Sequence, residues 1–402
     1  MMLLLEILLW LAVMLVGLPT VVLMVQCAVA TVGPVRRAPD PMPDQPRPRT
    51  AVLVPAHDEQ EIIADTIRRL RTQLEAGDRL VVVADNCTDA TAARARAAGA
   101  EVIEREDPQR RGKGYALARG VSLLRADPPQ VLVVIDADCR AEPGTIDHLA
   151  RLVGRLNLPQ QGLDLLDAPP GLATRAAISQ LAFVVKNHVR PTGLQRLGVP
   201  CPLMGTGMAI PFAALDQVDL ATGHLSEDMK LGIDLAIAGY PARFCPQAKV
   251  FSPMAGDTAS SLTQRTRWEQ GHLHTLLTQT PRLLYHALRQ RRPRLLAMAA
   301  DLLVPPLAAL SLLVLAVIFW TGLGAALGAS PWPLYLSSAL ALGLALTVLA
   351  AWARFGRDRV PAQALLAIPV YILWKLPIYV GFLWQRQRDW VRTQRQAPRP
   401  PP

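Results

Sequence analysis

Two aspartates follow directly after an apolar run in the middle of this chain. Asp136 and Asp138 come after VLVVI, residues 131–135. Carboxylates at i and i+2 of an extended segment project to the same side. Two such groups can hold a hard divalent cation, Mg²⁺ or Mn²⁺, which in turn neutralises a diphosphate. Taken alone, an Asp-x-Asp pair is also typical of a solvated turn with a capping aspartate.

Two further polar positions lie at the boundaries of apolar runs. Asp85 and Asn86 follow LVVVA, residues 80–84, and could contact a ligand or form a turn that caps the next helix. Lys113 lies between glycines in RRGKGYAL, at an expected helix start where anions bind well. The alternative for Lys113 is a flexible basic loop.

A pair of acidic residues, Glu227 and Asp228, follows Ser226 in the sequence SEDMKLG. Ser226 is a suitable N-cap, and acidic residues in a first helical turn often do no more than interact with the helix dipole. The functional interpretation makes Asp228 a general base held at a helix start.

A further pattern, QRTRW, occupies residues 264–268. On a helix, Gln264, Arg267 and Trp268 share one face because they are spaced i, i+3 and i+4. Arginine suits phosphate, and tryptophan offers a flat apolar surface to a sugar ring. The same composition also fits an amphipathic helix lying on a membrane.

The elements that must position these residues alternate between strands and helices. Apolar runs at 51–55, 80–84, 101–104 and 131–136 read as buried strands, and helical patterns follow the first three, to about residue 76, to Gly99 and over 115–124. Continuous apolar strands of this kind indicate a parallel sheet covered on both faces. Ligands bind such sheets at the carboxyl ends of the strands, where Asp85, Asp136 and Asp138 are expected.

Apolar segments long enough to cross a bilayer bracket this soluble region. They cover residues 7–30, 302–325 and 332–353. The first lacks a basic leader and exceeds the usual length of a signal-peptide core, so we interpret it as an anchor. Arg36 and Arg37 follow it, which predicts a cytoplasmic soluble domain. A fourth apolar segment, 363–384, contains a lysine and two prolines and is expected to be re-entrant or interfacial, with a cytoplasmic tail.

Charge and cysteine content exclude other classes. The net charge is +10, and much of the excess lies at 285–294 and 385–399, beside apolar segments, which favours anionic lipid headgroups over nucleic acid as the partner. The five cysteines have no metal-type spacing, which suits a reducing compartment. The expected organisation is an anchor (1–33), a proline-rich linker (34–49), a catalytic domain (50–280), an interfacial helix (281–300), a membrane region (301–385) and a basic tail (386–402).

The motifs occur in a characteristic order. PAHDE (55–59), Asp85, DAD (136–138), MGTGMAI (204–210), SED (226–228) and QRTRW (264–268) together resemble the membrane-bound branch of glycosyltransferase family 2. Cellulose, chitin and hyaluronan synthases, bacterial exopolysaccharide synthases and ceramide glucosyltransferases belong to that branch. The resemblance covers about residues 50–275. It implies a GT-A-type, Rossmann-like α/β domain with a mostly parallel sheet, flanked by transmembrane helices of a bacterial inner-membrane, multi-pass protein.

The resemblance also implies a role for each matching residue. Asp136 and Asp138 would hold the metal and Asp228, beside Glu227, would be the catalytic base. The loop with Gly205 and Thr206 would border the acceptor. Gln264, Arg267 and Trp268 would close over the pyrophosphate and pack against the acceptor sugar. The UDP-sugar donor would be bound by Ala56, His57, Glu59, Asp85, Lys113, Asp136, Ala137 and Asp138.

The implied activity is inverting, metal-dependent hexosyl transfer from a UDP-sugar, with Mg²⁺ or Mn²⁺. Two acceptors remain open at this point: a growing β-linked exopolysaccharide, made by an oligomer or with a secretion partner, and a single lipid. A third class, a transporter or non-catalytic membrane scaffold, is disfavoured because Asp136, Asp138, Asp228 and Arg267 are all present.

Overall fold

The computed structural model describes residues 2–33, 46–167, 174–254 and 258–384. Internal contacts divide the chain into two compact units, described separately below. Of the described residues, the sheet unit contains 46–167 and 200–271. The helical unit contains Met1–Pro34, Pro169–Val199 and His272–Arg386. Residues 169–199 therefore group with the apolar helices, whereas the sequence assigns them to the catalytic domain.

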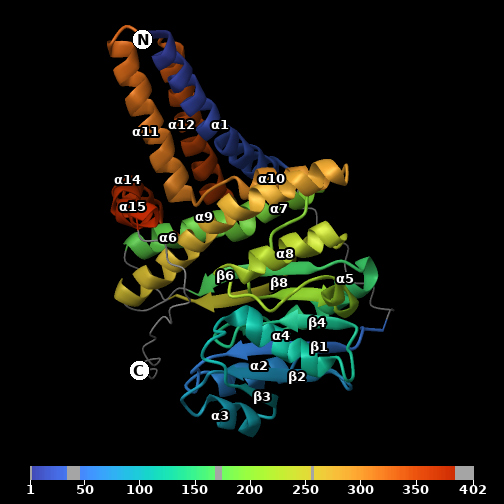
Figure 1. Ribbon diagram of the computed structural model, residues 1–402. Coiled ribbons are helices and arrows are strands. Elements are labelled where there is room, and N and C mark those ends of the chain that lie inside the picture. The colour runs from blue at the N-terminus through green and yellow to red at the C-terminus, as the bar shows by residue number, and fades with distance from the viewer. Residues whose placement is uncertain (1, 34–45, 168–173, 255–257, 385–402) are drawn as a thin grey trace. The chain divides into compact units, whose positions relative to one another are not determined.

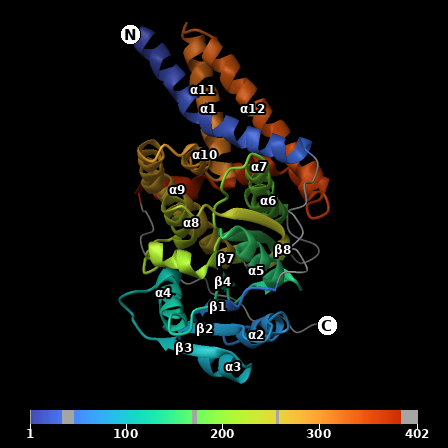
Figure 2. The same cartoon turned by 90° about the vertical axis from the view of Figure 1, so that its right-hand side faces the viewer.

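The sheet unit is built on one eight-stranded sheet with the order β3-β2-β1-β4-β7-β6-β8-β5 (Figures 1 and 2). The first four strands are parallel, as predicted. Beyond β4 the sheet is mixed, because β7 runs antiparallel to both β4 and β6 and β5 runs antiparallel to β8. The strands are β1 (Thr50–Ala56), β2 (Arg79–Asp85), β3 (Glu101–Arg105), β4 (Val131–Val134), β5 (Arg140–Ala141), β6 (Gln160–Asp167), β7 (Met208–Pro211) and β8 (Arg243–Pro253).

Helices cover the sheet through the apolar faces that the sequence pattern indicates. Fully buried Ile63, Ile67 and Leu70 of α2 join strand residues in one core. Helix α2 ends at Arg71, earlier than the predicted residue 76, because Asp78 accepts hydrogen bonds from the backbone N–H groups of Glu75 (2.9 Å) and Thr50 (2.9 Å) and turns the chain into β2. The helices of this unit are α2 (Ile63–Arg71), α3 (Thr91–Ala97), α4 (Lys113–Leu124), α5 (Thr145–Leu156) and α8 (Glu227–Ala238), with a 3₁₀ turn at Phe212–Gln217.

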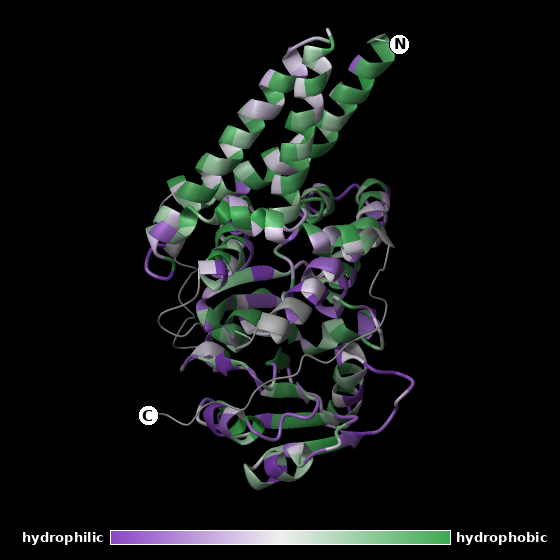
Figure 3. Ribbon diagram, turned by 90° about the vertical axis from the view of Figure 1, so that its left-hand side faces the viewer, coloured by the Kyte–Doolittle hydropathy of each residue, from purple (hydrophilic) through white to green (hydrophobic). Residues whose placement is uncertain are grey.

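The helical unit contains three helices long and apolar enough to cross a membrane, at Met2–Val32, Leu307–Ala326 and Trp332–Gly356. They correspond to α1 (Met2–Val32), α11 (Leu307–Ala326), and α12 (Trp332–Ala351) with the π-helical turn Trp352–Gly356. In Figure 3, which colours the ribbon by residue hydropathy, these helices are mostly green, the colour of hydrophobic residues. The second begins five residues later than the sequence predicts, because the Pro305-Pro306 pair separates it from α10 (Pro293–Leu302).

Glycines bring these three helices close together. A Cβ on Gly324 would lie 2.5 Å from Leu9, and a Cβ on Gly343 would lie 2.5 Å from Met24. Helix α1 therefore packs against both α11 and α12, with its amino-terminal end beside the turn that joins them. At that end the Glu6 carboxylate accepts a hydrogen bond from the Ser330 N–H (3.1 Å).

The remaining helices of this unit are shorter or partly polar. The expected interfacial helix 281–300 is two helices, because α9 (Thr258–Arg289) ends at a turn in which Arg291 has a left-handed backbone. The segment 363–384 forms α13 (Ala362–Leu365), α14 (Ile368–Trp374) and α15 (Leu376–Trp384), none long enough to count as a span. In Figure 1, α14 and α15 are seen end-on and cross the direction of α11. The interfacial placement of this segment stays a prediction, and the expected tail, 386–402, lies outside the described residues.

Helix α7 (Arg190–Arg196) continues α6 (Thr174–Val184) through the π-helical turn Val185–Val189 and crosses α1 closely. A Cβ on Gly193 would lie 2.0 Å from the carbonyl oxygen of Gln26. Arg196 donates to the carbonyls of Val29 (2.7 Å) and Ala30 (2.9 Å), which satisfies acceptors at the end of α1. These contacts explain why residues 174–196 belong to the helical unit.

A buried histidine in this unit predicts acid sensitivity. Burial, with the nearby charges of Lys186 and Arg190, lowers the pKa of His272 to about 3, and its Nε2 has no hydrogen-bond partner among the residues described. Below about pH 6.5 the unfolded chain binds a proton that the folded chain does not, so stability falls by about 1.4 kcal/mol per pH unit as the pH decreases towards 3. Above pH 6.5 this histidine contributes no pH dependence.

We therefore expect the melting temperature of the wild type to fall between about pH 7.5 and pH 5, and to fall less for His272→Gln. Thermal unfolding followed by tryptophan fluorescence in nanodiscs measures the difference. His286→Gln, on the same helix and half-buried, is the matched control and should keep the wild-type pH dependence. Equal pH profiles for the two variants would contradict the prediction.

Candidate active site

Asp136 and Asp138 lie in the loop that follows β4, which ends two residues before the first of them. Their carboxylates and the Cys139 sulfur lie within 4.8 Å of one another. The Cys139 thiol donates to Asp138 Oδ1 (3.4 Å), and burial followed by the charges of both aspartates raises its pKa well above the ordinary value. The two carboxylates supply oxygen donors, which fit Mg²⁺ or Mn²⁺.

Lys113, the first residue of α4, reaches this loop from a neighbouring element. Its ammonium forms an ion pair with Asp136 and donates to the carbonyl of Gly205 (2.7 Å). Burial alone would lower the pKa of Lys113, but the charges of Asp136, Glu227 and Asp228 together raise it above its ordinary value. The amine therefore keeps its positive charge. Because Lys113 begins helix α4, the alternative that it lies in a flexible basic loop is wrong.

The loop with Gly205 and Thr206 holds the acidic groups together. A Cβ on Gly205 would lie 3.3 Å from Asp228 Oδ2 and 3.5 Å from Lys113 Nζ, and the residue has a left-handed backbone that favours glycine. The hydroxyl of Thr206 accepts from the Asp136 N–H (3.2 Å). The structure thus brings together five predicted residues from four parts of the chain: Lys113, Asp136, Gly205, Thr206 and Asp228.

Glu227 and Asp228 occupy the first turn of α8, as predicted. Ser226 is at the N-cap position, but its side chain makes no capping hydrogen bond, so the helix N-terminus is left to the acidic residues. Burial, followed by the charge of Asp228, raises the pKa of Glu227 to about 7. Acidic groups this close together titrate as a coupled pair, and such a pair is suited to proton transfer near neutral pH.

Gln264, Arg267 and Trp268 lie on α9, so the predicted helical setting is confirmed. All three are half-buried. Farther along the helix, a Cβ on Gly271 would lie 2.6 Å from the Ser226 hydroxyl oxygen. Helix α9 therefore packs tightly against the residue that precedes Glu227.

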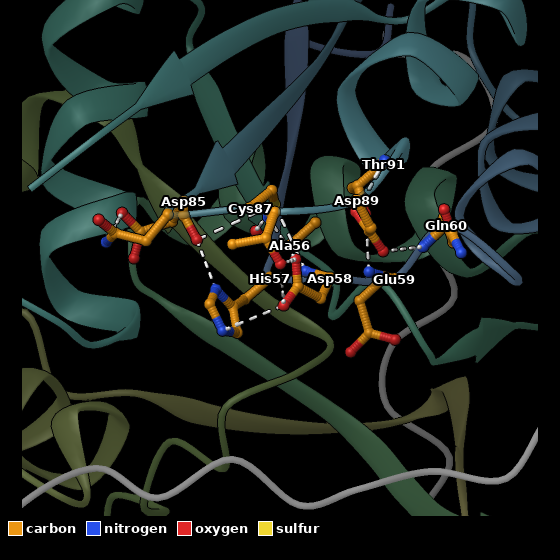
Figure 4. Close-up of polar contacts among 11 residues, drawn as sticks. Ala56, His57, Asp58, Glu59, Gln60, Asp85, Cys87, Asp89 and Thr91 are labelled. Carbon is orange, nitrogen blue, oxygen red and sulfur yellow. Dashed lines mark hydrogen bonds and ion pairs between the residues drawn. The ribbon is translucent and has the colours of Figure 1, made fainter. Parts of the chain in front are cut away.

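A second group of predicted residues lies at the carboxyl ends of β1 and β2 (Figure 4). The Nδ1–H of His57 donates to the backbone carbonyl of Asp85 (2.7 Å). The thiol of Cys87 contacts the carbonyl of Ala56 (3.6 Å). The backbone N–H of Glu59 donates to Thr91 (2.7 Å), and its carbonyl accepts from the first residues of α2. The Ala137 carbonyl, near the other group, accepts from Thr66 (2.7 Å).

Arg105, at the end of β3, is a further candidate site residue that none of the sequence motifs indicates. Its guanidinium donates to Asp85 Oδ1 (2.5 Å), pairs with Asp107 (3.0 Å) and lies over the ring of Tyr115. The sequence does contain an indication of this position. Ligands bind parallel sheets at the carboxyl ends of the strands, and Arg105 is the polar residue at the end of the third strand.

A second acidic group, Asp58, Cys87 and Asp89, is also compact enough to hold an ion. Its carboxylates already cap backbone groups: Asp58 Oδ1 accepts from the Thr88 N–H (2.6 Å), and Asp89 accepts from the Gln60 (3.1 Å) and Thr91 (2.9 Å) N–H groups. We interpret these residues as structural, because their hydrogen bonds hold together the loops that follow β1 and β2, which face each other in Figure 4.

The structure is similar to that of mannosyltransferase PcManGT from Pyrobaculum calidifontis, which was solved with GDP-Man and Mn²⁺ (TM-score 0.56, 18% identity, 95% of this chain and 100% of that one). The fold is thus the GT-A-like fold of glycosyltransferases. Residues 46–271, more than half of the chain, match the family model for "Glycosyltransferase like family 2", so the protein belongs to this family.

Curated relatives match parts of the chain. The probable glycosyltransferase YdaM of Bacillus subtilis is 26% identical over 247 residues, which is 57% of this chain and 56% of the relative. Glucosyl-3-phosphoglycerate synthase of Mycolicibacterium paratuberculosis is 37% identical over 94 residues, 22% of this chain and 28% of the relative. The chain thus spans about half or less of these relatives, and its own substrates are a matter for proposal.

Proposed function

We propose that this protein is a metal-dependent, inverting hexosyltransferase that moves a sugar from a UDP-sugar to a growing β-linked glycan at the cytoplasmic face of the membrane. The observation that carries the proposal is the convergence of Lys113, Asp136 and Asp228 on the Gly205 loop. A cation, a metal-ligating carboxylate and a candidate base within one small cluster are the parts that sugar transfer from a diphosphate requires.

The donor would extend between the two groups of predicted residues. Asp85, with Arg105, and His57 would receive the nucleoside, and Asp136 with Asp138 would hold Mg²⁺ or Mn²⁺ at the diphosphate. The cation, when bound, stabilises the charge on the departing diphosphate. Arg267 is proposed to add a second positive group from α9. The likeness to a GDP-Man-bound structure makes GDP-sugars the alternative donors.

The chemistry that follows is a single displacement. Asp228 removes the proton of the acceptor hydroxyl as that oxygen attacks the anomeric carbon. The bond from the anomeric carbon to the phosphate oxygen breaks, and the diphosphate leaves with the electron pair. The transition state resembles an oxocarbenium ion. An α-linked donor then gives a β-linked product, and Trp268 is proposed to pack against the acceptor sugar.

The acceptor decides between a polymer synthase and a glycolipid transferase. The purified protein in lipid nanodiscs would be given Mg²⁺ or Mn²⁺ and a panel of radiolabelled UDP- and GDP-sugars, and the product would be sized. We expect a high-mass, water-soluble product that a β-glycosidase degrades. Label confined to one lipid-extractable species would replace the polymer with a lipid acceptor. Absence of transfer by a protein that still binds UDP would favour a non-catalytic scaffold, or an oligomer that needs a secretion partner.

The orientation of the membrane helices follows from the distribution of charge in the helical unit. Arginines gather at the end where α1 and α12 finish, whereas the turn between α11 and α12 carries no charged residue. The positive-inside rule places the arginine-rich end in the cytoplasm, against anionic headgroups. The arginines are Arg289, Arg291, Arg292, Arg294, Arg354, Arg357 and Arg359.

This orientation predicts the accessibility of two exposed positions. A cysteine at Leu327, in the turn after α11, should react with a membrane-impermeant maleimide on intact spheroplasts. A cysteine at Arg291, in the turn before α10, should react only after the membrane is permeabilised. The wild type, with its own five cysteines, is the background control. The reverse pattern would overturn the proposed orientation.

A further inference from the structure

Lys113 lies beside the expected metal ligands, and its ammonium is paired with one of them. The ammonium is paired with Asp136 and also donates to the Gly205 carbonyl (2.7 Å). Its side chain is largely buried, with 17% of its surface exposed. The Asp136 carboxylate is therefore paired with a positive charge that the protein itself supplies.

The backbone around Lys113 is held in place, so only the side chain can change partner. A Cβ on the next residue, Gly114, would lie 2.6 Å from the carbonyl oxygen of Thr222 and 2.7 Å from that of Leu220. The start of α4 is thus seated against the loop 220–222. The four methylenes of the lysine, in contrast, allow its ammonium to move by several ångströms.

A divalent cation and this ammonium repel each other when both contact Asp136. A diphosphate removes the conflict, because its negative charges offer the ammonium a new partner and offer the metal further oxygen ligands. We propose that Lys113 is an internal counter-ion that competes with the divalent cation for Asp136, so that the cation and the nucleoside diphosphate bind as a pair. The proposal rests on the metal site of the proposed function.

Paired binding has a consequence for turnover. The coupling between two ligands is reciprocal, so a diphosphate that tightens metal binding is itself bound more tightly when the metal is present. When the nucleoside diphosphate leaves after transfer, the ammonium returns to Asp136 and the cation is released with it. Asp136 keeps a positively charged partner in both states.

The test measures Mn²⁺ binding and not catalysis. Free Mn²⁺ would be followed by electron paramagnetic resonance, with the full-length protein in nanodiscs, in the absence and presence of UDP. For the wild type we expect weak binding of Mn²⁺ alone and at least tenfold tighter binding with UDP. For Lys113→Gln we expect binding of Mn²⁺ alone to tighten at least tenfold and the effect of UDP to shrink below threefold.

Three further variants separate the possible outcomes. Lys249→Gln removes the same charge at an exposed position and should behave like the wild type. Lys113→Arg keeps the charge, so it should bind Mn²⁺ alone as weakly as the wild type does. That result would show that the tighter binding of Lys113→Gln comes from loss of the charge and not from misfolding. Asp136→Asn should abolish Mn²⁺ binding; if it does not, the metal site of the proposed function is wrong. If Asp136→Asn abolishes binding but Lys113→Gln leaves the affinity for Mn²⁺ alone unchanged, the counter-ion proposal is wrong and the metal site stands.

Discussion

Replacing Asp228 by asparagine is expected to lower turnover by about 10²- to 10⁴-fold, the range for loss of a general base. Asparagine has nearly the same shape as aspartate but cannot take a proton from the acceptor hydroxyl. The Asp228 carboxylate lies beside the Gly205 loop and Lys113, so the substitution changes the proton acceptor without removing the residues that hold the diphosphate. Binding of UDP and Mn²⁺ should therefore survive.

The measurement is release of UDP from the preferred donor under single-turnover conditions, with UDP binding measured separately. Asp216→Asn is the matched control, because Asp216 is exposed and paired with Arg125 (2.9 Å) outside the site. Glu227→Gln tests which carboxylate is the base, and its effect should be smaller than that of Asp228→Asn. Turnover of Asp228→Asn within tenfold of the wild type would rule out Asp228 as the base.

The parallel half of the sheet could be predicted from the sequence because its strands are uninterrupted apolar runs. Val52, Val82 and Val133 are fully buried, as strands covered on both faces require. The carboxyl ends of these strands then gave the positions of Asp85 and Asp136. This prediction needs no knowledge of distant contacts, since local pattern and the geometry of parallel sheets are sufficient.

The second half of the sheet could not be predicted in the same way. Strand β6 reads QQGLDLLD and carries polar residues at buried positions. Gln161 is buried because its amide donates to the Thr206 carbonyl (2.9 Å) and its oxygen accepts from the Met204 N–H (2.8 Å), which supports the Gly205 loop. Those partners lie more than forty residues away, and a local hydropathy pattern does not reveal them.

The contacts of Lys113 and the position of residues 174–196 depend on separations of the same kind. Lys113 meets Asp136 and Gly205 across 23 and 92 residues. The segment 174–196 has ordinary composition, and its place in the helical unit depends on Gly193 and on the partners of Arg190, which are 164 and 111 residues away. The order of motifs identifies the chemistry, whereas the three-dimensional structure is needed to show which residues meet.

That arginine leads to the largest stability effect that we expect outside the site. Arg190 of α7 donates to the Asp301 carboxylate (2.7 Å) and to Gln26 (3.1 Å), and Gln26 donates to Asp301 (2.9 Å). All three side chains are buried and come from three separate segments of the helical unit. Removing one partner of a buried ion pair leaves an uncompensated charge, which costs about 3–5 kcal/mol.

Asp301→Ala is therefore expected to lower the stability of the helical unit by about 3–5 kcal/mol, because the buried Arg190 charge keeps only neutral partners, Gln26 and the backbone carbonyl of residue 301. The double variant Arg190→Met with Asp301→Leu should recover most of this loss, since it removes both charges and keeps the volume filled. Thermal unfolding in nanodiscs, followed by tryptophan fluorescence, gives the comparison. Arg125→Ala, which breaks the exposed pair with Asp216, is the control and should cost no more than about 1 kcal/mol. If Asp301→Ala and this control melt at the same temperature, the buried pair does not hold α1, α7 and α10 together, and the close packing of Gly193 against the backbone of α1 must contribute more than the ion pair.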